Sequence, residues 1–363
     1  MLTKTVYNFN PGPAALPREV LEQARDELLD FAGTGMSVME ISHRSVEYER
    51  LNDESRERIR RLLGVPAGYE VLYLQGGASL QFAMVPLNLL VPGKVADYVS
   101  TGSWSNKAIK EARTVGEVRI AASTEQDGYR RVPDVGEIRP GPDAAYVHLT
   151  SNETIGGVQF HDFPDTGSVP LVADMSSDFM SRPVDVAKFA LIYAGAQKNV
   201  GPAGVTIVIV REDIARESPK HLPAMLRYDT FLKSRSLYNT PPVFAIYMVN
   251  LVLQWIERQG GLEAVEKLNR RKADMLYGAI DRSGGFYRGL AERESRSTVN
   301  ITFAVHDPAL EKQFLKEAEQ QGFVGLPGHR EVGHVRVSAY NAVSEESCKA
   351  LVEFMEDFQR RYG

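Results

Sequence analysis

The stretch YAGAQKNVGPAG (residues 193–204) places one lysine, Lys198, among glycine, alanine and proline, directly after the apolar run FALIY (residues 189–193). Lysine side chains are usually solvated at the protein surface, so a lysine at the end of a buried-looking strand is unusual. A lysine that reacts as an amine needs burial or a nearby cation to disfavour its charged form. Lys198 is therefore either a surface charge in a turn or a nucleophile, and the surrounding sequence has to distinguish the two.

Around this stretch, apolar runs and helical patterns alternate along the chain. The apolar runs are nearly continuous, which is typical of strands covered by helices on both faces of a sheet. Strands are expected within residues 70–77, 95–103, 117–123, 144–154, 169–178, 189–199 and 204–210. Apolar periodicity predicts helices at residues 18–31, 45–64, 78–90, 104–116, 244–259 and 262–280.

A different pattern begins near residue 297. It predicts a strand at 297–305, a helix at 308–322, a strand at 335–342 and a last helix at 344–362, with Ser344 as its N-cap. We therefore expect an α/β fold with two domains. The large domain, residues 16–265, would hold a mostly parallel sheet covered by helices, and residues 1–15 and 266–363 would form a smaller α+β domain.

The composition excludes several classes of protein. Of the 363 residues, 43% are hydrophobic, which is ample for a large core, and the net charge of −5 gives no general attraction to nucleic acid. The chain has no apolar run of about 18 residues that could span a membrane, and its first residues lack the apolar centre of a secretion signal. The single cysteine, Cys348, excludes an internal disulfide and a cysteine-rich zinc site. These features predict a cytoplasmic enzyme without a metal site, nucleic-acid partner or membrane segment.

Polar residues or glycines follow four of the predicted strands. Ligands bind at the carboxyl ends of strands in open α/β sheets, although turns favour the same residue types. The GGAS stretch at residues 76–79 precedes a helix and suits an anion such as phosphate, but it contains no Walker or G-x-G-x-x-G motif. The four strand ends are Gly76-Gly77-Ala78-Ser79, Thr150-Ser151-Asn152-Glu153-Thr154, Asp174-Met175-Ser176-Ser177 and Gln197-Lys198-Asn199.

Asp174 and Lys198 each end an apolar strand and lie 24 residues apart. One strand–connection–strand unit can bring both to the same side of the sheet, where they could form a simple ion pair. Alternatively, they suit pyridoxal phosphate (PLP), with which a lysine forms a Schiff base while an aspartate keeps the pyridine nitrogen protonated. Trp104, at the start of the helix after another strand, could cover the cofactor ring or belong to the core.

Four stretches together resemble the phosphoserine aminotransferases, a family of fold-type I, class V PLP-dependent enzymes. They are NFNPGPAALP (residues 8–17), LTSNETIGG (149–157), VADMSSDFMSRPVDV (172–186) and YAGAQKNVGPAG (193–204). The resemblance runs from Asn8 to the last helix. It implies that Lys198 forms the Schiff base and carries a proton, and that Asp174 binds the pyridine nitrogen. It also implies that Trp104 stacks on the ring and that Thr154 contacts it.

Further implied contacts concern the cofactor phosphate. The resemblance assigns it to Ala78, Ser79 and Gln197, and to Asn239 and Thr240 reaching across a homodimer with shared active sites. The stretch YNTPPVF (residues 238–244), which carries this last implication, could also simply break the chain before a helix.

The implied substrates, L-glutamate and 3-phosphohydroxypyruvate, each carry an α-carboxylate and a second anionic end. A planar arginine suits a carboxylate, and the resemblance implies Arg336 for the α-carboxylate. For the distal anion, it points to His43, Arg44, His329 and Arg330, which by themselves read as loop charges. Some family members carry an arginine at the position of Ser79, so the sharing of the distal anion among the other groups stays open.

We therefore expect PLP-dependent amino transfer that gives O-phospho-L-serine and 2-oxoglutarate in serine biosynthesis. The resemblance adds a related step of pyridoxine synthesis in some bacteria. Three alternatives stay open: a cysteine desulfurase with Cys348 as nucleophile, an aminotransferase of the alanine–glyoxylate type, and a non-catalytic PLP-binding protein.

Overall fold

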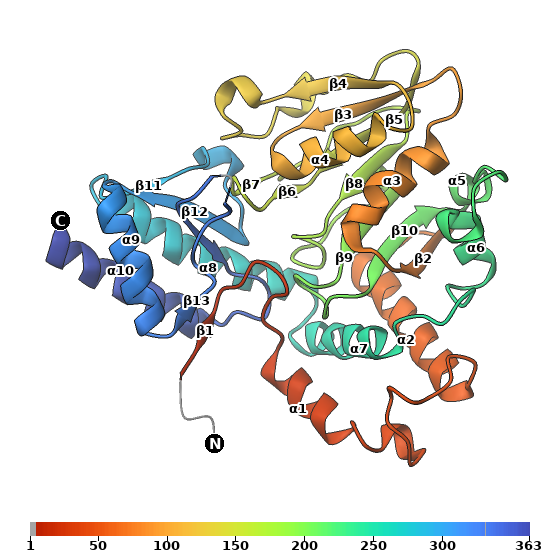
Figure 1. The fold of residues 1–363 in the computed structure, drawn as a ribbon, viewed down its shortest axis with the longest axis horizontal. Coiled ribbons are helices and arrows are strands. Elements are labelled where there is room, and N and C mark those ends of the chain that lie inside the picture. Colours follow the sequence, from red (N-terminus) through yellow and green to blue (C-terminus); the bar gives the residue numbers. More distant parts are fainter. Residues whose placement is uncertain (1–4, 331) are drawn as a thin grey trace.

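The computed structural model describes residues 5–330 and 332–363, in which the largest sheet has seven strands in the order β2-β10-β9-β8-β5-β3-β4 (Figure 1). Neighbouring strands are parallel from β9 to β4, whereas β10 runs antiparallel to both β9 and β2. The predicted α/β fold with a mostly parallel sheet is confirmed. The strands are β2 (Tyr69–Leu74), β3 (Val95–Ser100), β4 (Val118–Ser123), β5 (Ala144–Thr150), β8 (Leu171–Asp174), β9 (Leu191–Gly195) and β10 (Thr206–Arg211).

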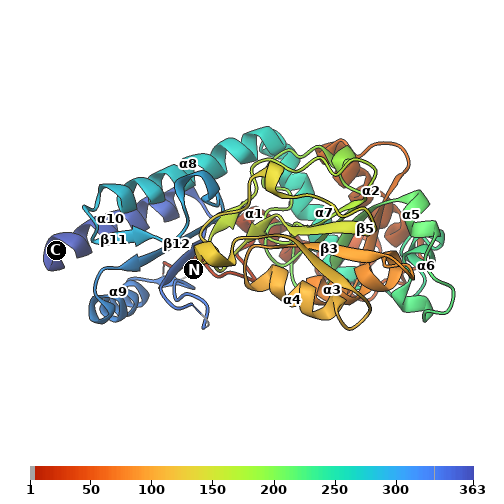
Figure 2. The same ribbon diagram turned by 90° about the horizontal axis from the view of Figure 1, so that it is seen from above.

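Helices cover both faces of this sheet (Figure 2). Successive side chains of a strand point to opposite faces, so Val71 and Leu72 belong to different apolar clusters. The cluster of Val71 packs against α2 (Val46–Leu63) and α7 (Val243–Arg258). The cluster of Leu72 packs against α3 (Gly77–Leu89), α4 (Ser103–Ala112) and α6 (Tyr228–Lys233), while α5 (Glu212–Arg216) follows β10.

A second body contains the antiparallel sheet β11-β12-β14 and its own apolar cluster. Phe9, from the start of the chain, is buried in this cluster, because β1 (Tyr7–Asn8) pairs in parallel with β13 (Phe323–Val324). The other elements of this body are α8 (Leu262–Arg282), β11 (Tyr287–Gly289), β12 (Asn300–Val305), α9 (Pro308–Gln320), β14 (Val335–Ser338) and α10 (Glu345–Tyr362).

The expected domain boundary at residue 265 lies inside α8. Leu262 and Val265 pack in the cluster of the large sheet, whereas Leu276 and Ile280 pack in the cluster of the second body. The helix therefore belongs to both bodies, and the division into two domains stays a prediction. Residues 1–4 of the expected small domain lie outside the described residues.

Helix ends follow local side-chain chemistry. Ser344 caps α10 by accepting a hydrogen bond from the Ser347 amide at 3.2 Å, as predicted. The helix expected at residues 18–31 is shorter: α1 (Arg18–Asp26) ends early, and Asp30 instead accepts from the Gly35 amide at 2.7 Å. Such local bonds compete with helix formation. None of the described helices is long and apolar enough to cross a membrane.

Candidate active site

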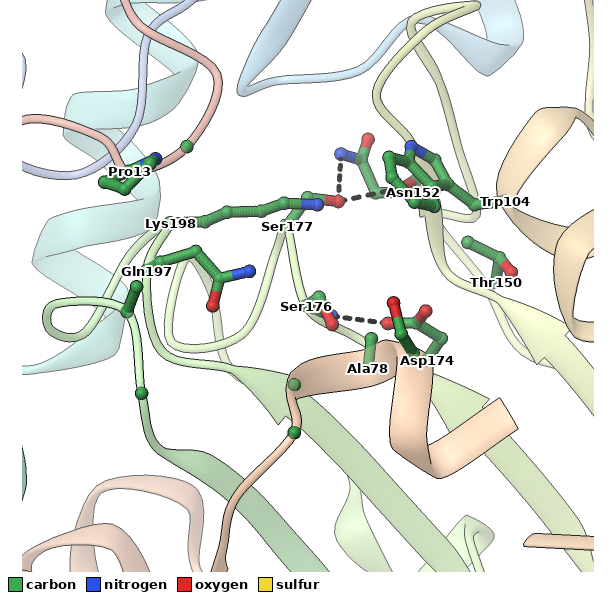
Figure 3. A pocket seen from close by; sticks show the side chains of 16 residues that line it. Pro13, Ala78, Trp104, Thr150, Asn152, Asp174, Ser176, Ser177, Gln197 and Lys198 are labelled. Atoms are coloured by element: carbon green, nitrogen blue, oxygen red, sulfur yellow. Dashed lines mark hydrogen bonds between the residues drawn. The ribbon is translucent and has the colours of Figure 1, made fainter. Parts of the chain in front are cut away.

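The four polar strand ends meet around one cavity of about 490 Å³ at the carboxyl ends of β2, β5, β8 and β9 (Figure 3). We call it the strand-end cavity. All strands of this sheet except β10 run in the same direction. Their carboxyl ends therefore lie on one side of the sheet, where turns that are distant in sequence become neighbours. The lining comes from residues 12–13, 76–79, 104, 150, 152, 174, 176–177, 197–198 and 203–204.

Asp174 and Lys198 line the strand-end cavity together, as predicted. Asp174 ends β8 with a side chain that is almost fully buried, and its Oδ1 accepts a hydrogen bond from the Ser176 amide at 2.9 Å. Lys198 lies in the turn after β9 and extends into the same space (Figure 3). Among the described residues no ion pair joins the two side chains, so the simple ion-pair interpretation does not describe this geometry.

Burial shifts both titrations toward the uncharged forms. It lowers the pKa of Lys198, although the carboxylates of Asp174 and Glu153 oppose this shift. It also raises the pKa of Asp174, although the charge of Lys198 opposes that shift. A lysine with a lowered pKa has more neutral amine at neutral pH, which is the form that attacks a carbonyl carbon.

The start of α3 forms one wall of the cavity, with Ala78 and Ser79 in its lining. Gly76 has a φ of 86°, and a Cβ on it would lie 2.6 Å from the Cβ of Leu80, so the turn requires glycine. The first N–H groups of a helix have no intrahelical acceptor and attract anions. Together with Gln197 on the opposite side, this wall suits a phosphate group.

Trp104, in the first turn of α4, also lines the cavity. Its Nε1 donates to the Thr154 hydroxyl at 2.9 Å, and the Lys198 Nζ lies 5.5 Å from its ring centroid. Thr154 thus binds the indole and is not among the residues of the lining, and its predicted contact with the cofactor stays a prediction. The lining also contains polar residues to which the sequence assigned no individual role, namely Thr150, Asn152, Ser176 and Ser177.

The predicted residues for substrate and for subunit contacts lie farther out. Arg336, on β14, is the nearest: its charge lowers the pKa of Lys198. Outside the lining are His43 and Arg44 in the segment before α2, His329 and Arg330 in the loop before β14, and Asn239 and Thr240 before α7. Asn239 donates to the Gln75 side chain at 3.3 Å, close to the start of α3, and Thr240 is exposed.

The chemistry of the lining fits PLP. The cavity offers a lysine amine, an aspartate, an indole ring and a helix start. Among the buried polar atoms of the described residues that lack a hydrogen-bond partner, two belong to the lining, Thr150 Oγ1 and Asn152 Oδ1, and another is Arg336 Nε. Buried polar groups are normally hydrogen-bonded, so these atoms are suited to a polar ligand.

Cys348 argues against the desulfurase alternative. Its side chain is fully buried in α10, within the cluster of the second body. Burial raises the pKa of its thiol to about 11, and a thiol is a poor nucleophile until it loses its proton. Cys348 therefore behaves as a small apolar residue of the core.

Comparison with known proteins gives the family. Residues 6–351 match the family model described as aminotransferase class-V. The phosphoserine aminotransferase of Niallia circulans is 60% identical over 362 residues, which cover all of both chains. The solved phosphoserine aminotransferase from Bacillus circulans subsp. alkalophilus is 61% identical, with a TM-score of 0.98 over 99% of each chain.

A third relative carries PLP in its solved structure. The solved PLP-bound phosphoserine aminotransferase from Trichomonas vaginalis is 38% identical, with a TM-score of 0.91 over 97% of this chain and 100% of that one. The chain thus belongs to the class-V aminotransferases, among the phosphoserine aminotransferases, and is a PLP-dependent enzyme of fold type I.

Proposed function

We propose that the enzyme transfers the amino group of L-glutamate to 3-phosphohydroxypyruvate and so forms O-phospho-L-serine and 2-oxoglutarate, in the cytoplasm and for serine biosynthesis. The observation that carries this proposal is the strand-end cavity, where Lys198 and Asp174 face the same space with Arg336 nearby. The names of the relatives support the choice of the phosphorylated substrate.

Each residue of the cavity has a task in this reaction. PLP, when bound, supplies an electron-accepting ring that stabilises negative charge at the substrate Cα. Asp174 would accept a hydrogen bond from the protonated pyridine nitrogen, and Trp104 would cover the ring. Lys198 would hold the cofactor covalently and move the proton at the substrate Cα, which is general acid–base work by an amine.

The anionic groups would be bound at two ends of the site. The start of α3, with Ala78, Ser79 and Gln197, would bind the cofactor phosphate. Arg336, whose Nε lacks a partner among the described residues, would bind the α-carboxylate of either substrate through its planar guanidinium. The distal phosphate or γ-carboxylate would be shared by His43, Arg44, His329 and Arg330.

Replacing Arg330 by alanine tests the distal assignment. A hydrogen bond to a charged group contributes about 1.5–3 kcal/mol, so kcat/KM for 3-phosphohydroxypyruvate should fall roughly tenfold to hundredfold. The rate with a non-phosphorylated keto acid should change much less. The measurement compares both substrates in this variant and in Arg258→Ala, which removes an exposed arginine at the end of α7. Equal losses for both substrates would show that Arg330 does not contact the phosphate.

We further propose a homodimer in which Asn239 and Thr240 complete the partner's phosphate site. Two observations support it: neither residue lines the cavity of its own chain, and apolar side chains are exposed near α1 and α2. The exposed fractions are 82% for Leu29, 58% for Met39 and 68% for Val46. Exposed apolar surface of this kind marks contact surfaces in many proteins.

Subunit exchange tests the shared site. Thr240→Glu puts a negative charge beside the partner's cofactor phosphate, and Lys198→Ala removes the reactive amine, so each variant alone should be inactive. In a hybrid dimer, the site built on the Thr240→Glu subunit has its own Lys198 and an intact Thr240 from its partner. Random exchange should therefore restore about one quarter of the parental activity per subunit.

The controls are each variant incubated alone and tagged subunits that report the exchange. If tagged subunits exchange and activity stays absent, Asn239 and Thr240 act within their own chain, and the shared-site proposal is wrong.

A further inference from the structure

Glu153 is a buried carboxylate to which the proposed reaction gives no task. Its side chain is about 1% exposed, and among the described residues it forms no ion pair. It ends the short strand β6 (Asn152–Glu153), between a residue of the cavity lining and the threonine that binds the indole of Trp104. A buried carboxylate destabilises a fold unless hydrogen bonds satisfy it, so its partners indicate its purpose.

The carboxylate binds two backbone amides at the start of α4, and the Ser105 side chain also interacts with it. Glu153 Oε2 accepts from the Trp104 amide at 3.1 Å, and Oε1 accepts from the Ser105 amide at 2.8 Å. These amides belong to the first turn of the helix, which has no intrahelical acceptors for them. The residue before the helix is Gly102, which has no side chain to supply a cap. The carboxylate of another segment therefore caps α4.

The approach is close enough to require this glycine. A Cβ on Gly102 would lie 2.8 Å from the carboxyl carbon of Glu153 and 2.9 Å from its Oε2. The Ser105 hydroxyl accepts from the amides of Thr101 and Gly102, at 2.9 and 3.0 Å. Four amides of the turn between β3 and α4 are thus bound by two side chains, which leaves this turn little freedom.

Glu153 and Thr154 hold the same residue in two ways. Glu153 binds the backbone of Trp104, and Thr154 binds its indole nitrogen at 2.9 Å. The ring so held lines the strand-end cavity, beside the end of Lys198 (Figure 3). We propose that Glu153 is a positioning residue that fixes the ring of Trp104 against the cofactor by clamping the first turn of α4. This inference rests on the proposed covering role of Trp104.

Three substitutions separate the properties of the carboxylate. Glu153→Gln keeps the length but offers one acceptor oxygen, so one buried amide loses its partner. Glu153→Asp keeps the charge and both oxygens but is one methylene shorter. Gly102→Ala keeps Glu153 and its charge but places a Cβ where the carboxylate lies. A positioning role predicts the same defect in all three variants.

The test measures the fluorescence of Trp104 in cofactor-free protein. The chain has two tryptophans, so a Trp255→Phe background leaves Trp104 as the only one and serves as the reference. We expect each variant to shift the Trp104 emission to longer wavelength and to increase its quenching by acrylamide. Because a buried amide without its partner weakens the site, PLP should dissociate with a Kd roughly tenfold higher in the Gln and Asp variants.

Asp307→Ala is the control, because Asp307 caps α9 in the second body by accepting from the Ala309 amide at 2.6 Å, and alanine removes that cap. It should lower the melting temperature without changing the Trp104 emission or the Kd of PLP. Parental emission and quenching in Glu153→Gln would overturn the proposal. Parental emission, quenching and Kd of PLP in Glu153→Asp would also overturn it. The negative charge beside Lys198 would then matter, rather than a side chain long enough to bind the amides of α4.

If Glu153→Gln fails to fold, Gly102→Ala decides, and parental Trp104 emission in that variant would overturn the proposal.

The Trp104 emission is measured without cofactor or substrate, so it does not depend on the proposed reaction. A parent protein with a fixed Trp104 that does not aminate 3-phosphohydroxypyruvate would therefore contradict the proposed function and leave the role of Glu153 intact.

Discussion

Lys198→Ala is expected to lower the rate of amino transfer by at least roughly 10⁴-fold, because general acid–base catalysis alone contributes roughly 10²–10⁴-fold and the covalent attachment of the cofactor is lost as well. No other described lysine lines the strand-end cavity, so nothing replaces the amine. Lys198→Arg should be equally inactive, since a guanidinium stays protonated at any working pH.

The measurement combines steady-state rates with borohydride reduction followed by mass spectrometry. Reduction should attach the cofactor permanently to the parent protein but not to Lys198→Ala, from which dialysis should remove it. Lys188→Ala, which removes an exposed lysine before β9, is the control. Near-parental turnover in Lys198→Ala would contradict its assignment as the reactive amine.

The fold should tolerate the loss of Lys198. Burial lowers the pKa of this lysine in the folded chain, so below that pKa the bound proton favours the unfolded state. Alanine removes this destabilisation at neutral pH. The cofactor-free variant is therefore expected to melt no earlier than the cofactor-free parent, which distinguishes a chemical defect from a folding defect.

Asp174→Asn is expected to lower kcat by about 10³-fold, which corresponds to about 4 kcal/mol of transition-state stabilisation. Asparagine can still accept the hydrogen bond from the Ser176 amide, but it carries no charge to hold a proton on the pyridine nitrogen. The ring then accepts electrons poorly. The cofactor should still bind, so the visible spectrum of the loaded protein reports occupancy while stopped-flow rates report the chemistry.

The direction in which Asp174→Asn changes the stability of the cofactor-free protein can also be predicted. Burial raises the pKa of Asp174 in the folded chain, so at neutral pH the ionised carboxylate favours the unfolded state, which binds its proton less tightly. Asparagine removes this effect, and cofactor-free Asp174→Asn should melt at or above the temperature of the parent. A variant that melts early and retains parental activity per folded molecule would show that Asp174 is structural.

The site residues that end or directly follow a strand of the large sheet were predictable from the sequence. Asp174 and Lys198 follow apolar runs, and in a parallel sheet the ends of such runs meet on one side. Trp104 follows in the same way from the strand β3. The pattern that locates a strand therefore also locates the side chains that follow it, and both the sheet and the inner part of the site could be derived.

Other features depend on contacts that no local pattern encodes. Glu153 binds amides 48 and 49 residues away, and Thr154 binds an indole rather than lining the cavity. The five-residue helix α5 and the six-residue helix α6 are too short for a periodic signal. Strand β1 has two residues and exists only because β13 is beside it.

The pairing of β1 with β13 also sets an order for biosynthesis. Gly12 and Pro13 line the cavity, and the segment before them is held by β13 and by a hydrogen bond from the Tyr340 hydroxyl to the Pro11 carbonyl at 3.0 Å. Phe323 of β13 lies 125 residues after Lys198 in the chain, so a ribosome adding about 5–20 residues per second needs roughly 6–25 s between the two. During that interval the nascent chain carries its reactive lysine in a site with one wall unfixed. That wall is therefore completed only after most of the chain has been translated, and the vitamin-derived cofactor can be retained securely only from then on.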